Sequence, residues 1–157
     1  MKVVIQRVSE ATVTVDGETI AAVGRGLVLL VGLATGDGEA EVAWMAQKIA
    51  NLRVFADAEG LMNAALGDIG GQVLAIPQFT LLADCGKGRR PSFDYAMAPA
   101  HAKPLFERFV TLLAARTGHV AIGRFGASMQ VRLINDGPVT LVIERSGPRA
   151  ARPGSGW

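Results

Sequence analysis

Residues 11–34, ATVTVDGETIAAVGRGLVLLVGLA, decide the kind of fold that this sequence encodes. Residues 11–15 alternate between apolar and polar side chains, which is typical of a strand with one buried face. The Asp16-Gly17 pair that follows is a strong signal for a hairpin turn into a short strand over residues 18–23. Residues 27–34 are almost continuously apolar, which suits a central strand covered on both faces. The stretch therefore predicts a β-sheet in which a hairpin lies beside a buried strand.

The rest of the chain supplies further strands and two helices. Additional strands are predicted over residues 3–8, 52–55, 61–65, 72–82, 120–123, 129–134 and 139–145. One helix is predicted over residues 39–51 with Asp37 as its N-cap. A second covers residues 99–116, with Pro99 or Pro104 in or near its first turn, where a missing N–H is tolerated. We therefore predict a single α/β domain with a mostly antiparallel, barrel-like sheet and two main helices, unlike the regular strand–helix alternation of a doubly wound fold.

Composition narrows the setting of the protein. The chain has 157 residues, of which 50% are hydrophobic and 19% charged, and this balance argues against disorder and hints at apolar surface buried between subunits. A net charge of +2 permits a nucleic-acid partner without demanding one. The longest apolar run is too short to cross a bilayer, and the N-terminal residues alternate instead of forming a signal peptide. A cytoplasmic protein is expected, with a disordered tail over residues 146–157, which are rich in Gly, Pro and Arg.

The residue types that usually carry catalysis are scarce. Cys85 is the single cysteine, so neither an internal disulfide nor a thiolate metal site is expected. The two histidines, His101 and His119, lie far apart in the sequence and have no cysteine or carboxylate at ligand spacing. No phosphate-binding glycine loop is present. The sequence therefore predicts no metal and no cofactor, and it offers no histidine-based triad.

Two polar clusters interrupt predicted strands. Gln78-Phe79-Thr80 follows Pro77 inside the apolar stretch LAIPQFTLLAD of residues 74–84, and alternation along a strand would put Gln78 and Thr80 on one face. This cluster fits either an edge strand with one face in water or the wall of an active site. Asn135-Asp136-Gly137-Pro138 fits either a tight turn between two strands or a functional segment. Pattern alone leaves both alternatives open.

Several motifs in the same order resemble the D-aminoacyl-tRNA deacylases, homodimeric editing enzymes. The motifs are Gln6-Arg7-Val8, Gly26-Leu27, Leu52-Arg53-Val54-Phe55, Met62-Asn63, Gln78-Phe79-Thr80-Leu81, Gly88-Arg89-Arg90-Pro91-Ser92-Phe93, Gly123-Arg124-Phe125-Gly126-Ala127-Ser128-Met129-Gln130-Val131 and Asn135-Asp136-Gly137-Pro138-Val139-Thr140. The resemblance covers residues 1–145, which are expected to form the deacylase domain, and it stops before the tail.

The resemblance implies hydrolysis of the ester that joins a D-amino acid, or the glycine mischarged on tRNA(Ala), to the terminal adenosine of tRNA. It implies that the Gly137-Pro138 bond is cis and reaches into the pocket of the partner subunit, where it rejects L-amino acids. Gln78-Phe79-Thr80 would form the floor of that pocket, and Arg7 would hold the crossing segment. Phe125 and Met129 match positions near the terminal adenosine.

The resemblance also implies that the 2′-hydroxyl of the terminal ribose activates water, and we expect backbone N–H groups around Phe79 and Thr80 to stabilise the oxyanion. Thr80 is the rival nucleophile, but it has no histidine or lysine nearby in the sequence to activate it. The chain departs from the family at Pro77, where a serine is usual. No hydrogen bond of that serine can be inherited here.

Three basic residues, Lys87, Arg89 and Arg90, are the candidate tRNA contacts, because phosphate binding needs cations and carries no sequence information directly. Two other functions stay open at this stage. One is a sister-type deacylase with a trans Gly-Pro that acts on L-alanyl-tRNA. The other is a non-catalytic, dimeric nucleic-acid-binding module.

Overall fold

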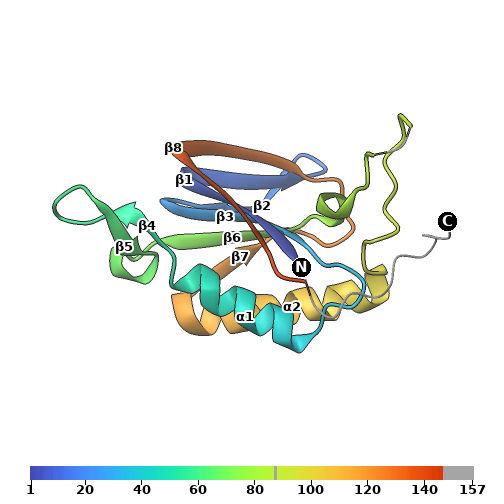
Figure 1. The fold of residues 1–157 in the computed structure, drawn as a ribbon. Helices are drawn as coiled ribbons and strands as arrows, with labels where there is room; N and C mark the ends of the chain where they lie inside the picture. Colours follow the sequence, from blue (N-terminus) through green and yellow to red (C-terminus); the bar gives the residue numbers. More distant parts are fainter. Residues whose placement is uncertain (87, 147–157) are drawn as a thin grey trace.

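The computed structural model describes residues 1–86 and 88–146, and it is a mixed α/β domain with both long helices packed on one face of a strongly curved sheet (Figure 1). The main sheet consists of β1 (Lys2–Val15), β2 (Glu18–Val23), β3 (Gly26–Gly32), β6 (Gln72–Pro77), β7 (Val120–Ile122) and β8 (Gln130–Glu144). The other elements are α1 (Glu39–Ala50), α2 (Pro99–Thr117), the hairpin of β4 (Arg53–Ala56) and β5 (Met62–Ala65), and two short 3₁₀ helices, η1 (Gly67–Ile69) and η2 (Phe79–Leu82). The barrel-like α/β prediction is confirmed.

The strand order is β2-β1-β3-β6-β7, and β8 pairs with the other side of β1. The pairs that involve β1 are antiparallel, as is the β4–β5 hairpin, whereas β6 runs parallel to both β3 and β7. The sheet is therefore mostly antiparallel, as expected. It also positions the candidate site, because β6 ends directly before Gln78-Phe79-Thr80 and β8 contains Gly137-Pro138.

β1 is longer than predicted, since the separate strands expected over residues 3–8 and 11–15 form one strand. No turn chemistry interrupts it at Ser9-Glu10. Instead its pairing with β8 shifts register twice, between Gln6 and Val8 and between Val8 and Glu10. Such irregularities bend a strand and raise its twist. One half of β1 therefore pairs with β3 and the other half pairs with β2.

The curved sheet separates two apolar cores. Alternate residues of β3 point to opposite sides, so Leu27 and Leu29 pack against the helices while Val28 packs inside the curl of the sheet. The central-strand prediction for this segment is confirmed, except that β3 ends at Gly32 instead of residue 34. Gly26 at its start is a position of close approach, because an added Cβ would lie 1.8 Å from the carbonyl oxygen of Gln72.

The helices match their predicted ranges closely. Pro99 occupies the first turn of α2. The predicted cap of α1 is wrong, because Gly38 is the N-cap and the Glu41 carboxylate accepts a hydrogen bond from its N–H at 2.9 Å. Across residues 1–86 and 88–146, no helix is both long and apolar enough for a membrane span. The tail expected to be disordered lies, from residue 147 onward, outside the described part of the chain.

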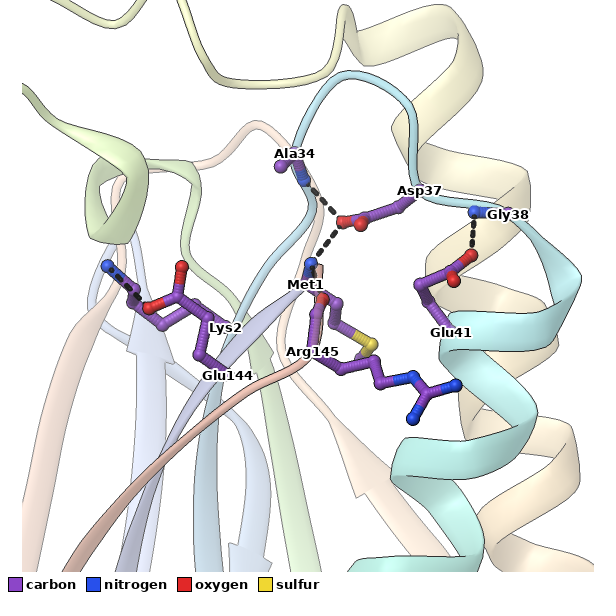
Figure 2. A network of polar contacts seen from close by, with 8 residues as sticks. All are labelled: Met1, Lys2, Ala34, Asp37, Gly38, Glu41, Glu144 and Arg145. Carbon is purple, nitrogen blue, oxygen red and sulfur yellow. Dashed lines mark hydrogen bonds and ion pairs between the residues drawn. The ribbon is translucent and has the colours of Figure 1, made fainter. Parts of the chain in front are cut away.

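Asp37 has a different task, which Figure 2 shows. Its Oδ2 lies 2.6 Å from the Met1 ammonium and accepts a hydrogen bond from Ala34 N–H at 2.7 Å. The Met1 ammonium also donates to the carbonyl oxygen of Arg145 at 2.7 Å. The carboxylate therefore ties the start of β1 to the β3–α1 loop, and the ammonium ties it to the end of β8.

Candidate active site

The strand predicted over residues 72–82 ends at Pro77, and the next residues form the 3₁₀ helix η2. The Gln78 N–H still donates to the Val31 carbonyl at 2.7 Å, so the ladder with β3 continues to this residue. The chain then turns, and Leu81 N–H donates to Gln78 O at 3.3 Å. Pro77 is tolerated because it is the last residue of the strand, where few further ladder bonds are needed.

Gly32 at the end of β3 gives η2 its place. An added Cβ on Gly32 would lie 2.4 Å from Leu82 Cδ2 and 3.1 Å from the Gln78 carbonyl oxygen. A larger residue would require the Leu82 side chain to move and the Gln78 carbonyl to shift by a few tenths of an ångström. The position of Gln78-Phe79-Thr80 thus depends on a glycine far away in the sequence.

The turn into η2 changes which side chains and backbone N–H groups of residues 78–80 are accessible. The expectation that Gln78 and Thr80 share a strand face is wrong, because neither residue lies in a strand, although their side chains are hydrogen-bonded to each other. The ring of Phe79 is 57% exposed. Phe79 and Thr80 begin a 3₁₀ helix, and the first N–H groups of a helix have no intrahelical acceptor. Two backbone donors are therefore available at this point, which a strand would have used in its ladder.

A cleft of about 370 Å³ opens beside this turn. It is lined on one side by Ile76, Pro77, Gln78 and Phe79, and on the other by Gly126, Ala127, Ser128, Met129 and Val131. Met129 thus lies in the same cleft as Gln78 and Phe79, and its Sδ would be 2.8 Å from a Cβ added to Gly123. Phe125 does not line the cleft; its ring packs 6.4 Å from that of Phe106 on α2.

A larger cleft, of about 610 Å³, lies between the β3–α1 loop and α2. Both of its carboxylates, Asp37 and Glu39, are already paired. Glu39 accepts a hydrogen bond from Arg108 Nε at 2.8 Å, and this bond lowers the pKa of Glu39 below its usual value. Asp37 is occupied by Met1. The smaller cleft is therefore the better candidate for chemistry, because its donors are unused.

The second predicted cluster is not a turn, because β8 runs without interruption from Gln130 to Glu144. The two strands expected over residues 129–134 and 139–145 are therefore one. β8 advances five residues, from Asn135 to Thr140, where β1 advances two, from Gln6 to Val8, so β8 carries three extra residues in a bulge. The Gly137-Pro138 bond within the bulge is cis, as the family resemblance implied.

Arg7 holds this bulge in place. Its Nε lies 3.0 Å from Asp136 Oδ2 and donates to the Asp136 carbonyl at 3.1 Å, while Nη2 donates to the Gly137 carbonyl at 3.4 Å. On its other side Nη1 donates to the Val54 carbonyl at 2.5 Å. The Arg7 side chain is 14% exposed, and its bonds to the carbonyls of Asp136 and Val54 are partly buried. The planar fork of arginine suits such a multidentate contact.

Within one chain the bulge of β8 and the cleft beside η2 are separate, because Gly137 and Pro138 do not line the cleft of Gln78 and Phe79. The sequence did not identify Asp136 as a partner of Arg7. A signal existed, since an acidic residue precedes Gly137, but only the register of β8 brings it opposite Arg7.

The predicted tRNA contacts lie on the loop after η2. Lys87 lies outside the described residues, while Arg89 and Arg90 are exposed and form no ion pair with any residue in the described part. The loop also carries Phe93, to which the sequence assigned no role; its ring centroid lies 5.1 Å from that of Phe79. In the described ranges, no group of three or more His, Cys, Asp or Glu side chains could hold a metal ion.

Comparisons with known proteins identify the family of this chain. The family model described as D-Tyr-tRNA(Tyr) deacylase matches residues 4–144. Proteins named D-aminoacyl-tRNA deacylase from Halalkalibacterium halodurans and Roseiflexus castenholzii are 54% and 56% identical over 144 residues, which is 92% of this chain and 99% and 92% of theirs. A solved structure named c-Myc DNA unwinding element binding protein aligns with a TM-score of 0.87 at 41% identity, over 94% of this chain and 100% of that one. This chain belongs to the D-Tyr-tRNA(Tyr) deacylase family.

Proposed function

We propose that this protein hydrolyses the ester of D-aminoacyl-tRNA and releases the free D-amino acid and tRNA. The observation that carries the proposal is the whole-domain match to relatives named D-aminoacyl-tRNA deacylase, at 54% and 56% identity over 92% of the chain. Two of the motifs that carry the family resemblance supply one wall of the cleft and the bulge of β8.

The cleft supports catalysis by positioning and by backbone donors. Its lining residues include no histidine, carboxylate or amine, so the protein offers no ordinary general base at this place. The 2′-hydroxyl of the terminal ribose is the proposed activating group for the attacking water. The N–H groups of Phe79 and Thr80 would donate to the carbonyl oxygen as it becomes negative, which is the role of an oxyanion hole. Gln78 is held by Thr80 and would help to orient the ester.

Adenosine would occupy the part of the cleft beside Met129. This wall is formed by the loop at residues 126–129, and Phe125 supports it from the core side instead of contacting the ligand directly. Lys87, Arg89 and Arg90 are the proposed phosphate contacts. An enzyme with this substrate would work in the cytoplasm, as the sequence predicts.

Selection between D- and L-amino acids is proposed to come from a second copy of the chain. Rigid carbonyl oxygens can reject an L side chain by overlap, whereas attraction for one methylene yields only about 1–3 kcal/mol. The cis Gly137-Pro138 segment would supply these carbonyls, and Arg7 would hold it in place by binding the carbonyls of Asp136 and Gly137. Glycine carries no side chain that could clash, so glycyl-tRNA(Ala) would also be a substrate.

The proposed homodimer would join the bulge of one subunit to the cleft of its partner. Large apolar side chains on β8 are consistent with such a contact, since Ile134 is 54% exposed and Val142 is 63% exposed. Exposed apolar residues that gather on one strand are typical of a protein–protein contact.

The deciding experiment compares the turnover of matched D- and L-aminoacyl-tRNAs, with glycyl-tRNA(Ala) as a third substrate. We expect hydrolysis of the D-ester and of the glycyl ester, and protection of the L-ester. Preferential hydrolysis of L-alanyl-tRNA would instead identify the sister-type enzyme. Binding of tRNA without cleavage of any ester would identify a nucleic-acid-binding module, a reading to which the name of the DNA unwinding element binding protein gives some weight.

One variant and one modified substrate test the chemistry. The Thr80→Ala variant should retain hydrolysis of normal substrate, while wild-type protein should fail on tRNA that ends in 2′-deoxyadenosine. The opposite pair of results, loss in the first assay and retention in the second, would make Thr80 the activating group and rule out the ribose.

A further inference from the structure

We propose that Phe93 is a stacking residue for a nucleobase of the single-stranded 3′ end, the one that precedes the terminal adenosine, with Arg89 and Arg90 beside its phosphates. The inference rests on the proposed function in one respect only, that the ligand is the 3′ end of a tRNA. It adds a subsite outside the cleft where the ester would be cleaved.

Phe93 directly follows the point at which the loop after η2 is closed. Asp84 and Ser92 exchange two backbone hydrogen bonds of 2.8 and 2.9 Å. Just beyond the closure, Ala96 N–H donates to the Phe93 carbonyl at 2.9 Å, and Ser92 Oγ lies 2.6 Å from Asp94 Oδ2. The backbone on both sides of Phe93 is therefore anchored, and the ring is presented from a fixed position.

The ring lies at the rim of the cleft without being buried there. Phe93 is 38% exposed and meets Phe79 edge to face, with 5.1 Å between the ring centroids and 66° between the planes. Phe79 itself lines the cleft and is 57% exposed. An aromatic pair left in solvent forgoes much of the free energy that burial would provide, so its exposure points to a ligand that covers it.

The charges on the same loop indicate what that ligand is. Arg89 and Arg90 are exposed and have no carboxylate partner among the residues that the structure describes. Aromatic rings that stack on bases, combined with cations that follow the phosphates, are the common means of binding single-stranded nucleic acid. The reactive ester occupies the cleft at the terminal adenosine. The preceding nucleotide extends out of the cleft, and in the proposed path it passes over the exposed pair of Phe79 and Phe93.

The first test is the binding of a labelled RNA oligonucleotide that ends in the cytidine–cytidine–adenosine sequence of tRNA. Fluorescence anisotropy gives its Kd for the wild-type protein and for Phe93→Leu, Phe93→Trp and Leu61→Ala. We expect Phe93→Leu to weaken binding by about five- to tenfold, the low end for loss of one stacked base, and Phe93→Trp to restore it. Leu61 is 66% exposed on the β4–β5 hairpin, so Leu61→Ala is the matched loss of an exposed apolar side chain and should change nothing.

The second test separates this subsite from the cleft. Each variant is assayed on D-aminoacyl-adenosine and on the D-aminoacyl trinucleotide, and the ratio of the two kcat/KM values is compared. In the wild type the trinucleotide should be preferred, and Phe93→Leu should reduce that preference about five- to tenfold through KM. Equal ratios in wild type and Phe93→Leu would overturn the proposal, as would equal Kd values in the first test.

The remaining outcomes are also decisive. If Phe93→Leu changes the sedimentation behaviour but not RNA binding, a second copy of the chain covers the ring and the proposal is wrong. If no D-ester is cleaved by any variant while RNA binding still depends on Phe93, the proposed function fails and the stacking site stands. If D-esters are cleaved but neither cleavage nor RNA binding depends on Phe93, the proposed function stands and the stacking site fails.

Discussion

The ammonium of Met1 and the carboxylate of Asp37 form a buried ion pair whose loss should destabilise the whole domain. The two groups are 2.6 Å apart, with side-chain exposures of 0% and 2%. Asp37→Asn removes the charge but keeps an oxygen that can accept from Ala34 N–H. Removing one partner of a buried pair costs about 3–5 kcal/mol, and we expect about 3 here because the ammonium keeps the Arg145 carbonyl.

Urea unfolding, followed by tryptophan fluorescence at one protein concentration, measures this loss as a change in the free energy of unfolding. In thermal unfolding the melting temperature should fall by roughly 6–12 °C, since about 1 kcal/mol corresponds to 2–4 °C for a domain of this size. Asp37→Ala should cost about 1 kcal/mol more, because it also leaves the Ala34 N–H without its acceptor.

The neighbouring pair of Lys2 and Glu144 supplies the control (Figure 2). Its charges are 3.5 Å apart, but the side chains are 29% and 55% exposed, so Glu144→Gln should cost less than about 1 kcal/mol. The reasoning is refuted if Asp37→Asn and Glu144→Gln lower the free energy of unfolding by similar amounts. That result would mean that water reaches the Met1 ammonium in the folded protein.

Three further predictions concern the bulge, the sheet and the proposed dimer. Arg7→Lys keeps the charge but loses the fork that binds two carbonyls, so the ratio of D- to L-ester hydrolysis should fall at least about tenfold in a kinetic assay. Gly26→Ala puts a Cβ 1.8 Å from the Gln72 carbonyl oxygen and should lower the free energy of unfolding by about 3 kcal/mol or more in urea. Val142→Lys should shift the protein toward monomer in sedimentation, while an unchanged association state would show that β8 is not the subunit contact.

Much of the fold was predictable because its signals are local. The hairpin at Asp16-Gly17 and the two helices depend on turn chemistry and on apolar spacing within a few residues. The end of β6 was missed because residues 79–82 have the composition of a strand. As η2 they pack closely on Gly32, a tertiary contact that no local pattern contains.

The geometry of the candidate site was even harder to predict from local sequence patterns, for the same reason. Asn135-Asp136-Gly137-Pro138 has turn composition, and local pattern therefore left a turn as one of its two readings, yet the segment stays in β8 as a bulge. Its shape depends on Arg7, which is remote in sequence and becomes its neighbour only through the pairing of β1 with β8. The family motifs pointed to these residues without the geometry that joins them.

β1 connects the two halves of the proposed pocket, which are the wall at Gln78 and Phe79 and the bulge at Gly137-Pro138. On one side it pairs with β8 and places Arg7 against the carbonyls of the bulge. On the other side it pairs with β3, whose Val31 carbonyl accepts from the N–H of Gln78 at the start of the cleft wall. Backbone hydrogen bonds therefore fix the positions of the bulge and of the cleft wall relative to the same strand. In a symmetric dimer the fit of one subunit's bulge to the other's cleft would be fixed twice by the same few residues. A substitution that shifts β1 by a fraction of an ångström would then disturb selection and catalysis together, whereas a change confined to Arg7 would disturb selection first.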